Sequence, residues 1–154
     1  LIIKHKNLTL ELSEEKVLVE KLFREVNSHS GKGVYGLKDI IQFLKNNVID
    51  TLLVTDDINL YRLEIKCKRC QNMQEEIIER LKIVPRKTEL LNKPCPNCKS
   101  MDQEAISQDL VDYLSLIAAQ VGTKLEVISG VTEYGAMLGS LGKMGAILRY
   151  NPNQ

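Results

Sequence analysis

The sequence predicts an α/β fold, a mixed-sheet α/β sandwich into which a small β minidomain is inserted. Two observations lead to this prediction. Helical and strand patterns alternate along most of the chain, and all four cysteines lie in one stretch where that alternation stops. We therefore divide the 154 residues into a discontinuous α/β domain, residues 1–60 and 101–154, and an inserted minidomain, residues 61–100.

Before the insert, the pattern predicts two helices and a strand. Ser13 is the expected N-cap of the first helix. The apolar residues that follow recur at spacings of three and four, as on one face of a helix: Val17, Leu18, Leu22 and Val26. A second helix is expected over residues 36–47. Residues 50–55 are mostly apolar, which is typical of a buried strand in an α/β sheet.

After the insert, the alternation resumes. A strong apolar stripe predicts a helix over residues 110–121, closed by Gly122 as its C-terminal cap. Residues 124–129 are expected to form a strand, residues 132–141 a short helix, and residues 144–150 a final strand. The insert thus interrupts the chain between a strand and a helix, where a loop can accept an added module.

The insert carries two C-x-x-C pairs, Cys67 with Cys70 and Cys95 with Cys98. Each such turn lets two thiolates bind one ion, and two turns complete a tetrahedral shell of four sulfurs. Soft sulfur ligands favour zinc, with iron a less common occupant. The sequence therefore predicts one structural zinc ion in a zinc-ribbon-like minidomain, with no open coordination position for catalysis.

The spacer between the two pairs is 24 residues long, and we expect a β-hairpin to span it, with residues 62–66 entering and residues 77–84 returning. Other states of the cysteines are free thiols without metal, or adventitious disulfides. A thioredoxin-like redox pair is disfavoured by the positions of the two motifs. Nothing in the sequence suggests secretion, so we expect a reducing, cytoplasmic location.

Charge is unevenly distributed. Residues 61–100 contain ten Lys or Arg and five Asp or Glu, whereas the rest of the chain contains eleven and fifteen. Contact with ribosomal RNA through charge is consistent with that basic excess, although Tyr61 alone offers a ring there for base stacking. No apolar stretch is long enough for a membrane helix. His5 and His29 are isolated, and we expect no enzyme activity. The chain starts without Met, which we interpret as a boundary within a longer protein.

Several segments together resemble a known family. Residues 33–39, running on to residues 50–54, are similar to the start of the third domain of archaeal and eukaryotic class-1 peptide chain release factors. Residues 122–129 resemble a strand of that domain, and residues 142–150 resemble its terminal Ile-Leu-Arg-Tyr signature. The cysteine pairs fit archaeal members, whose inserted minidomain often carries cysteines.

The resemblance implies a role in translation termination. In this family the third domain binds the translational GTPase that delivers the factor and contacts the ABC-type ATPase that recycles the ribosome. Stop-codon reading and peptidyl-tRNA hydrolysis belong to other domains, and this chain has no Gly-Gly dipeptide for the hydrolytic loop. We therefore expect a partner-binding adaptor domain.

Within the resemblance, Arg149 and Tyr150 are the candidate partner-binding residues. The alternative is that Tyr150 covers the core and Arg149 is solvated. Two other functions stay open: an RNA-binding zinc-ribbon protein whose host fold is similar to that of kink-turn binders, and a domain of the ribosome rescue factor pelota. The cysteine insert favours the release factor over pelota.

Overall fold

The computed structural model describes the backbone of residues 8–153 and the side chains of residues 13–153, so His5 lies outside the described residues. The chain forms two compact units. Unit 1 comprises Leu1–Ile58 and Ser115–Gln154, and unit 2 comprises Asn59–Leu114. The predicted insert, residues 61–100, lies within unit 2, which also takes in the strand and the start of the helix that follow.

Unit 1 contains a four-stranded sheet in the order β1-β7-β2-β6. Its strands are β1 (Gly33–Tyr35), β2 (Ile49–Thr55), β6 (Lys124–Ile128) and β7 (Met144–Leu148). Strand β7 is antiparallel to both β1 and β2, whereas β2 and β6 are parallel. The sheet is therefore mixed, as predicted.

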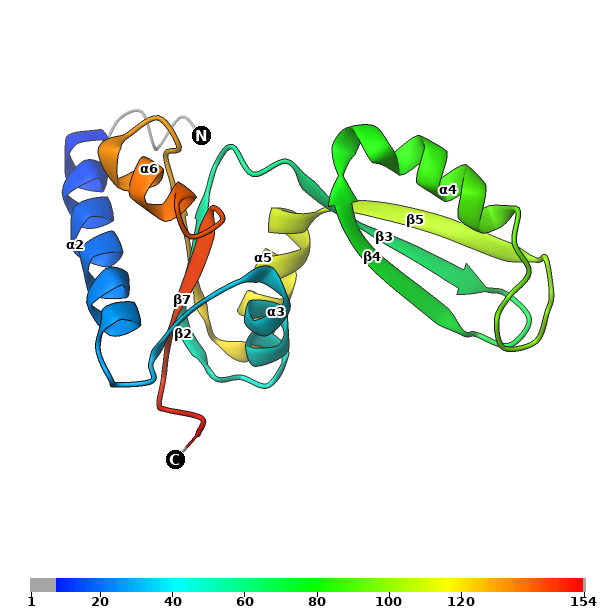
Figure 1. Ribbon diagram of the computed structural model, residues 1–154, viewed down its shortest axis with the longest axis horizontal. Coiled ribbons are helices and arrows are strands. Elements are labelled where there is room, and N and C mark those ends of the chain that lie inside the picture. Colours follow the sequence, from blue (N-terminus) through cyan, green and yellow to red (C-terminus); the bar gives the residue numbers. More distant parts are fainter. Residues whose placement is uncertain (1–7, 154) are drawn as a thin grey trace. The chain divides into compact units, whose positions relative to one another are not determined.

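Strand β2 is buried along almost its whole length because it lies inside the sheet with a helical layer on each face. Leu53 belongs to a core cluster with residues of α2 (Leu8–Asn27) and α6 (Glu133–Gly139). Successive strand residues point to opposite faces, so Leu52 faces the layer that contains α3 (Leu37–Lys45). Figure 1 shows α2 and α6 on one side of this sheet and α3 on the other.

The predicted elements of unit 1 are all present, with small shifts of their ends. The first helix starts at Leu8, so the prediction of Ser13 as its N-cap is wrong: Ser13 lies within the helix. Thr132 caps α6 by accepting a hydrogen bond from the backbone N–H of Gly135 at 3.0 Å. Gly122 follows α5 (Leu110–Val121) with φ of 73°, the left-handed cap conformation that glycine adopts most easily.

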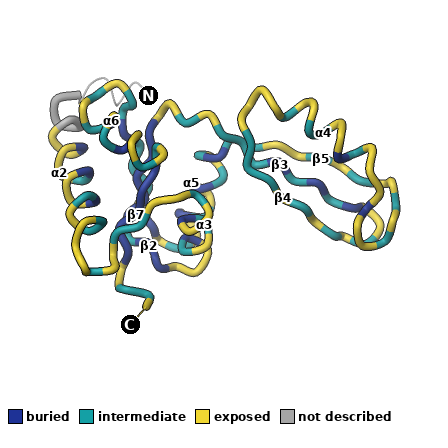
Figure 2. The backbone as a smooth tube through the Cα atoms, in the orientation of Figure 1, coloured by how far each residue is buried: buried dark blue, intermediate teal, exposed yellow. Residues whose placement is uncertain are grey.

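Unit 2 contains a three-stranded antiparallel sheet in the order β4-β3-β5. The strands are β3 (Leu60–Cys67), β4 (Met73–Glu79) and β5 (Gln103–Asp109). Helix α4 (Ile83–Leu91) packs on one face and buries Leu90 against Leu63 and Ile65. Figure 2 shows how little of this unit is buried in comparison with the β2 and β7 region of unit 1.

The predicted spacer hairpin is correct only in its first part. Ile77 and Ile78 lie in β4, which pairs with β3, but Val84 lies in α4. Pro85 argues against a helix in the sequence because proline lacks a backbone N–H. In the structure it lies in the first turn of α4, where helical N–H groups have no partner within the helix. Strand β5 was not predicted because its sequence is mostly polar, as suits an edge strand.

Among the described residues, no helix is both long enough and apolar enough to cross a membrane.

The position of Leu53 predicts a large effect of truncation on the stability of unit 1. Leu53→Ala should lower the free energy of unfolding by about 2–5 kcal/mol, because it leaves a cavity in the core between β2, α2 and α6. Leu116→Ala is the matched control: Leu116 is 58% exposed, so the change should stay within about 0.5 kcal/mol. Urea unfolding followed by circular dichroism measures both. Equal effects of the two variants would contradict this account of the core.

Candidate metal centre

The four cysteines lie at one end of the unit 2 sheet. Cys67 is the last residue of β3, and Cys70 follows in the turn that leads to β4. Cys95 and Cys98 lie in the loop between α4 and β5. The antiparallel pairing of β3 with β5 places Cys67 opposite Gln103, which brings the second loop beside the first. Sheet pairing thus joins two motifs that are far apart in the sequence.

The four sulfur atoms all lie within 4.8 Å of one another. The Sγ atoms of Cys67 and Cys98 are 3.5 Å apart, and those of Cys70 and Cys95 are 3.6 Å apart. Sulfurs at the corners of a tetrahedron with zinc–sulfur bonds of about 2.3 Å would be about 3.8 Å apart. All four cysteines are free thiols. The arrangement therefore fits one tetrahedral metal ion.

The two C-x-x-C turns share a backbone hydrogen bond and a left-handed residue. In the first, the N–H of Gln71 donates to the carbonyl of Cys67 at 3.0 Å, and in the second the N–H of Lys99 donates to that of Cys95 at 2.9 Å. Gln71 and Lys99 both have φ of 67°, in the left-handed region. Each first cysteine sulfur also accepts a backbone N–H, from Cys70 at 3.5 Å and from Asn97 at 3.4 Å. Such repeated turns present paired sulfurs in a fixed direction.

The thiols differ in acidity. The Asn97 side chain, followed by the backbone at Asn72, lowers the pKa of Cys70 to about 6. At Cys98 the backbone of Ser100 lowers the pKa, but burial and hydrogen bonds with the other three thiols outweigh this and raise it to about 11. One thiol thus loses its proton readily while a neighbour keeps its own, because several negative charges would share a small volume. A divalent cation bound between the sulfurs would remove this conflict.

All four predicted ligand residues therefore come together, although metal binding itself stays a prediction. Asn97 was not predicted from the sequence; its side chain lowers the pKa of Cys70, and its backbone N–H donates to the Cys95 sulfur. The left-handed residues Gln71 and Lys99 were not predicted either. Each of these two residues directly follows a C-x-x-C pair, and that position is the sequence feature that could have indicated its left-handed conformation.

The candidate partner residues Arg149 and Tyr150 follow β7 in unit 1, far along the chain from the cysteines. Both are exposed, and 53% of Tyr150 is accessible. The Arg149 guanidinium donates a hydrogen bond to the carbonyl of Val121 at 3.2 Å, at the C-terminal end of α5, where a cation is favourable. Tyr150 is thus not a core residue, and Arg149 has a structural contact in addition to its exposed surface.

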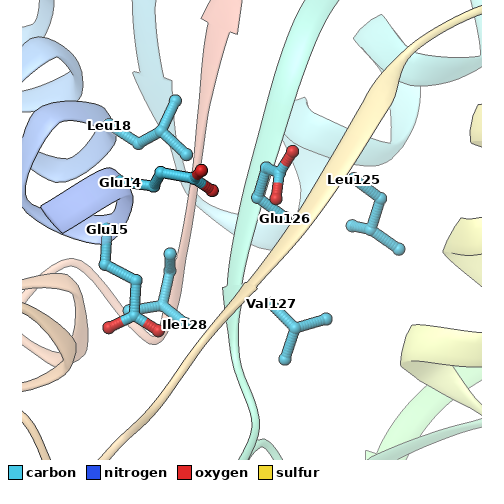
Figure 3. A pocket seen from close by; sticks show the side chains of 7 residues that line it. All are labelled: Glu14, Glu15, Leu18, Leu125, Glu126, Val127 and Ile128. Atoms are coloured by element: carbon cyan, nitrogen blue, oxygen red, sulfur yellow. The ribbon is translucent and has the colours of Figure 1, made fainter. Parts of the chain in front are cut away.

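Helix α2 lines several hollows of unit 1, including one that Lys21 and Glu25 share with Arg149 and the two that are described next. The first has a volume of about 270 Å³ and lies between α2 and β6; Figure 3 shows Glu14 and Glu15 from the helix and Glu126 from the strand in its lining. Glu15 accepts a hydrogen bond from the backbone N–H of Ser129 at 3.2 Å. The residues that line this hollow are acidic or apolar, and they include no Ser, Cys, His or Lys nucleophile.

The second hollow is a groove of about 420 Å³ between α2 and α6. Its lining includes the apolar residues Phe23 and Met137 and the charged residues Glu20 and Arg24. The groove was not among the sites predicted from the sequence.

Comparison with known proteins places the chain in a family. The model of the family described as eRF1 domain 3 matches residues 12–152. Peptide chain release factor subunit 1 of Methanocaldococcus jannaschii is 32% identical over 147 residues, which are 94% of this chain and 35% of that protein. The chain thus spans about a third of the length of this curated relative.

Solved structures agree with the sequence comparison. The C-terminal domain of a peptide chain release factor from Methanosarcina mazei superposes with a TM-score of 0.85 at 29% identity, covering 99% of this chain and 92% of that one. Archaeal Pelota, from a model of ribosome-bound Pelota and ABCE1, gives a TM-score of 0.53 at 19% identity and covers 92% of this chain and 27% of its own, a likeness in fold alone. Since the family model extends over nearly the whole chain and a release factor shares about a third of its residues, this chain belongs to the eRF1 domain 3 family of peptide chain release factors.

Proposed function

We propose that this chain acts in translation termination as an adaptor domain without catalysis of its own. The observation that carries the proposal is the family match over residues 12–152, together with the fold shared with a release factor C-terminal domain. Stop-codon reading and peptidyl-tRNA hydrolysis would then belong to other parts of such a factor.

The proposed partners are the translational GTPase, the ABC-type ATPase of ribosome recycling, and the ribosome. Support for the ATPase comes from fold: a protein that contains a domain of this fold, archaeal Pelota, occurs with ABCE1 in a ribosome-bound model. Support for a protein-binding surface comes from unit 1, which carries the α2–α6 groove and the exposed residues Arg149 and Tyr150. A cytoplasmic location follows from this role.

We also propose that the four cysteines hold one zinc ion whose role is structural. The sulfur spacing suits a tetrahedral site, and four protein ligands leave no position for a substrate. The chain itself supplies the reason for a metal: the buried core of unit 2 below α4 consists of Leu63, Ile65 and Leu90. So small a core gains much from a metal that joins its loops.

Metal content is the direct test of the cysteine site. The reduced protein should contain one zinc per chain by elemental analysis, and Cys95→Ser should lose it, because Cys95 is a buried ligand position. The β3, β4 and β5 amides should then exchange faster with deuterium, while β2 amides in unit 1 keep their protection. Ser28→Ala, which changes an exposed residue of unit 1, is the control. A protein that folds unit 2 fully with four free thiols and no metal would contradict the proposal.

The partner surface is tested by titration calorimetry with the translational GTPase, loaded with a non-hydrolysable GTP analogue. The Arg149→Ala, Tyr150→Ala double variant should weaken binding roughly tenfold or more, because exposed Arg and Tyr residues often dominate interfaces. Tyr35→Ala is the matched control: Tyr35 is 51% exposed, close to Tyr150, but lies on β1.

Two results would contradict parts of this proposal. Equal affinities of the double variant and the parent would exclude Arg149 and Tyr150 as contact residues, and a Phe23→Ala variant would then test the α2–α6 groove. Absence of any binding by the parent chain would contradict the adaptor role.

A further inference from the structure

The hollow of unit 1 that includes Arg149 combines cations from three separate segments. It has a volume of about 370 Å³. Its three cations are Lys21 of α2, Lys32 of the loop before β1, and Arg149 after β7, and two carboxylates, Glu25 and Asp50, share the lining. We call it the Arg149 hollow. It is large enough to receive a side chain of another molecule.

The charges of this hollow are not paired with one another. Among the residues that the structure describes, none of its three cations forms an ion pair, although two carboxylates line the same hollow. Each carboxylate instead accepts a hydroxyl from its own neighbourhood: Glu25 from Ser30 at 2.5 Å, and Asp50 from Thr51 at 2.8 Å. The hollow therefore keeps more unused donors than acceptors.

The backbone fixes the segments that carry these cations. A Cβ atom at Gly33 would lie 2.3 Å from the backbone nitrogen of Val26, so the absence of a side chain lets α2 approach the start of β1 closely. The N–H of Leu148 donates to the carbonyl of Lys32 at 2.7 Å, which joins the loop before β1 to the end of β7. The hollow is thus formed by the packing of unit 1 itself.

The side chain of Arg149 is held in place at this end of the sheet. Its guanidinium donates to the carbonyl of Val121 at 3.2 Å, at the last residue of α5, where the helix end favours a cation. A guanidinium has several N–H donors, so the other donors can bind a further acceptor. A cation that is already positioned loses little conformational freedom when it binds a ligand.

We infer that the Arg149 hollow receives an aspartate or glutamate side chain of a protein partner, whose carboxylate is bound by Lys21, Lys32 and Arg149. The inference rests on the proposed adaptor role. It adds the chemistry of the contact and two contact residues, Lys21 and Lys32. In a hollow that is partly shielded from water, the attraction between opposite charges is stronger than on an open surface.

The surroundings favour a single carboxylate over the phosphates of a nucleic acid. Glu25 and Asp50 lie in the same lining and would repel a row of phosphates, whereas one carboxylate can approach the cations alone. Unit 1 contains eleven Lys or Arg and eleven Asp or Glu, so it has no general attraction for a polyanion. Tyr150 is exposed directly after Arg149, and both residue types are common in protein interfaces.

The first test is titration calorimetry with the translational GTPase, loaded with a non-hydrolysable GTP analogue. The Lys21→Gln, Lys32→Gln variant should bind roughly three- to tenfold more weakly than the parent, and the difference should shrink at high salt. The matched control is Lys16→Gln with Lys38→Gln, which removes the same charge from exposed positions of α2 and α3 outside this hollow. The control should change the affinity by less than about twofold.

A variant with the opposite expected effect separates the inference from a loss of stability. Asp50→Asn removes one negative charge from the hollow and keeps an oxygen that can accept from Thr51. It should strengthen binding of the GTPase by about twofold, and damage to the fold would not do so. Thermal unfolding is measured for every variant. Weaker binding by Asp50→Asn without a lower melting temperature would overturn the inference.

The outcomes distinguish this inference from the adaptor role on which it rests. If the parent binds the GTPase and the Lys21, Lys32 variant binds it as the control does, the inference is overturned and the adaptor role stands. If the parent does not bind, the adaptor role fails, and NMR titration with an acetylated tetraglutamate amide decides the inference. Its addition should shift the amides of Lys32, Asp50 and Arg149, and the tetraglutamine peptide should not. Equal shifts with both peptides, no shifts, or a preference for single-stranded RNA would overturn it.

Discussion

The parallel pairing of β2 with β6 is the constraint on which the organisation of this chain depends. Two parallel strands in one sheet need a crossover connection, because the chain must return to the same end of the sheet before the second strand begins. Here that connection runs from Thr55 to Lys124 and contains all of unit 2 as well as helix α5. The insert therefore occupies a connection that the host fold requires anyway.

Unit 2 solves a different physical problem, since its sheet has a helix on one face and buries few large side chains. The two C-x-x-C turns lie beside the paired ends of β3 and β5. A metal bound by all four sulfurs would therefore link the two loops at this end of the sheet. In this respect the cysteines and the helix have complementary roles. The helix contributes Leu90 to the apolar core, and sulfurs bound to a metal would hold the connecting loops.

The electrostatics of unit 2 depend on where its boundaries lie. Residues 61–100 alone appear strongly basic, but the structure adds β5 and the start of α5, with four more acidic residues, to the same unit. Over the whole unit, ten Lys or Arg stand against nine Asp or Glu, so little of the apparent excess is left. A charge count over a sequence window therefore overstated the basic character of the unit, because strand pairing joins residues that the window separated.

The sequence by itself determined the α/β class, most helices and strands of the host unit and the two C-x-x-C pairs, because each is encoded locally. Helical periodicity, a short apolar run such as that of β2 and the C-x-x-C spacing all act within a few residues. The tertiary structure alone decided the extent of unit 2, the edge strand β5 and the proximity of the two C-x-x-C pairs. It also showed that the segment around Val84 forms a helix, α4, and not a strand. Those features depend on pairing and packing between distant segments: β5 is polar in sequence and becomes a strand only because β3 offers it hydrogen bonds.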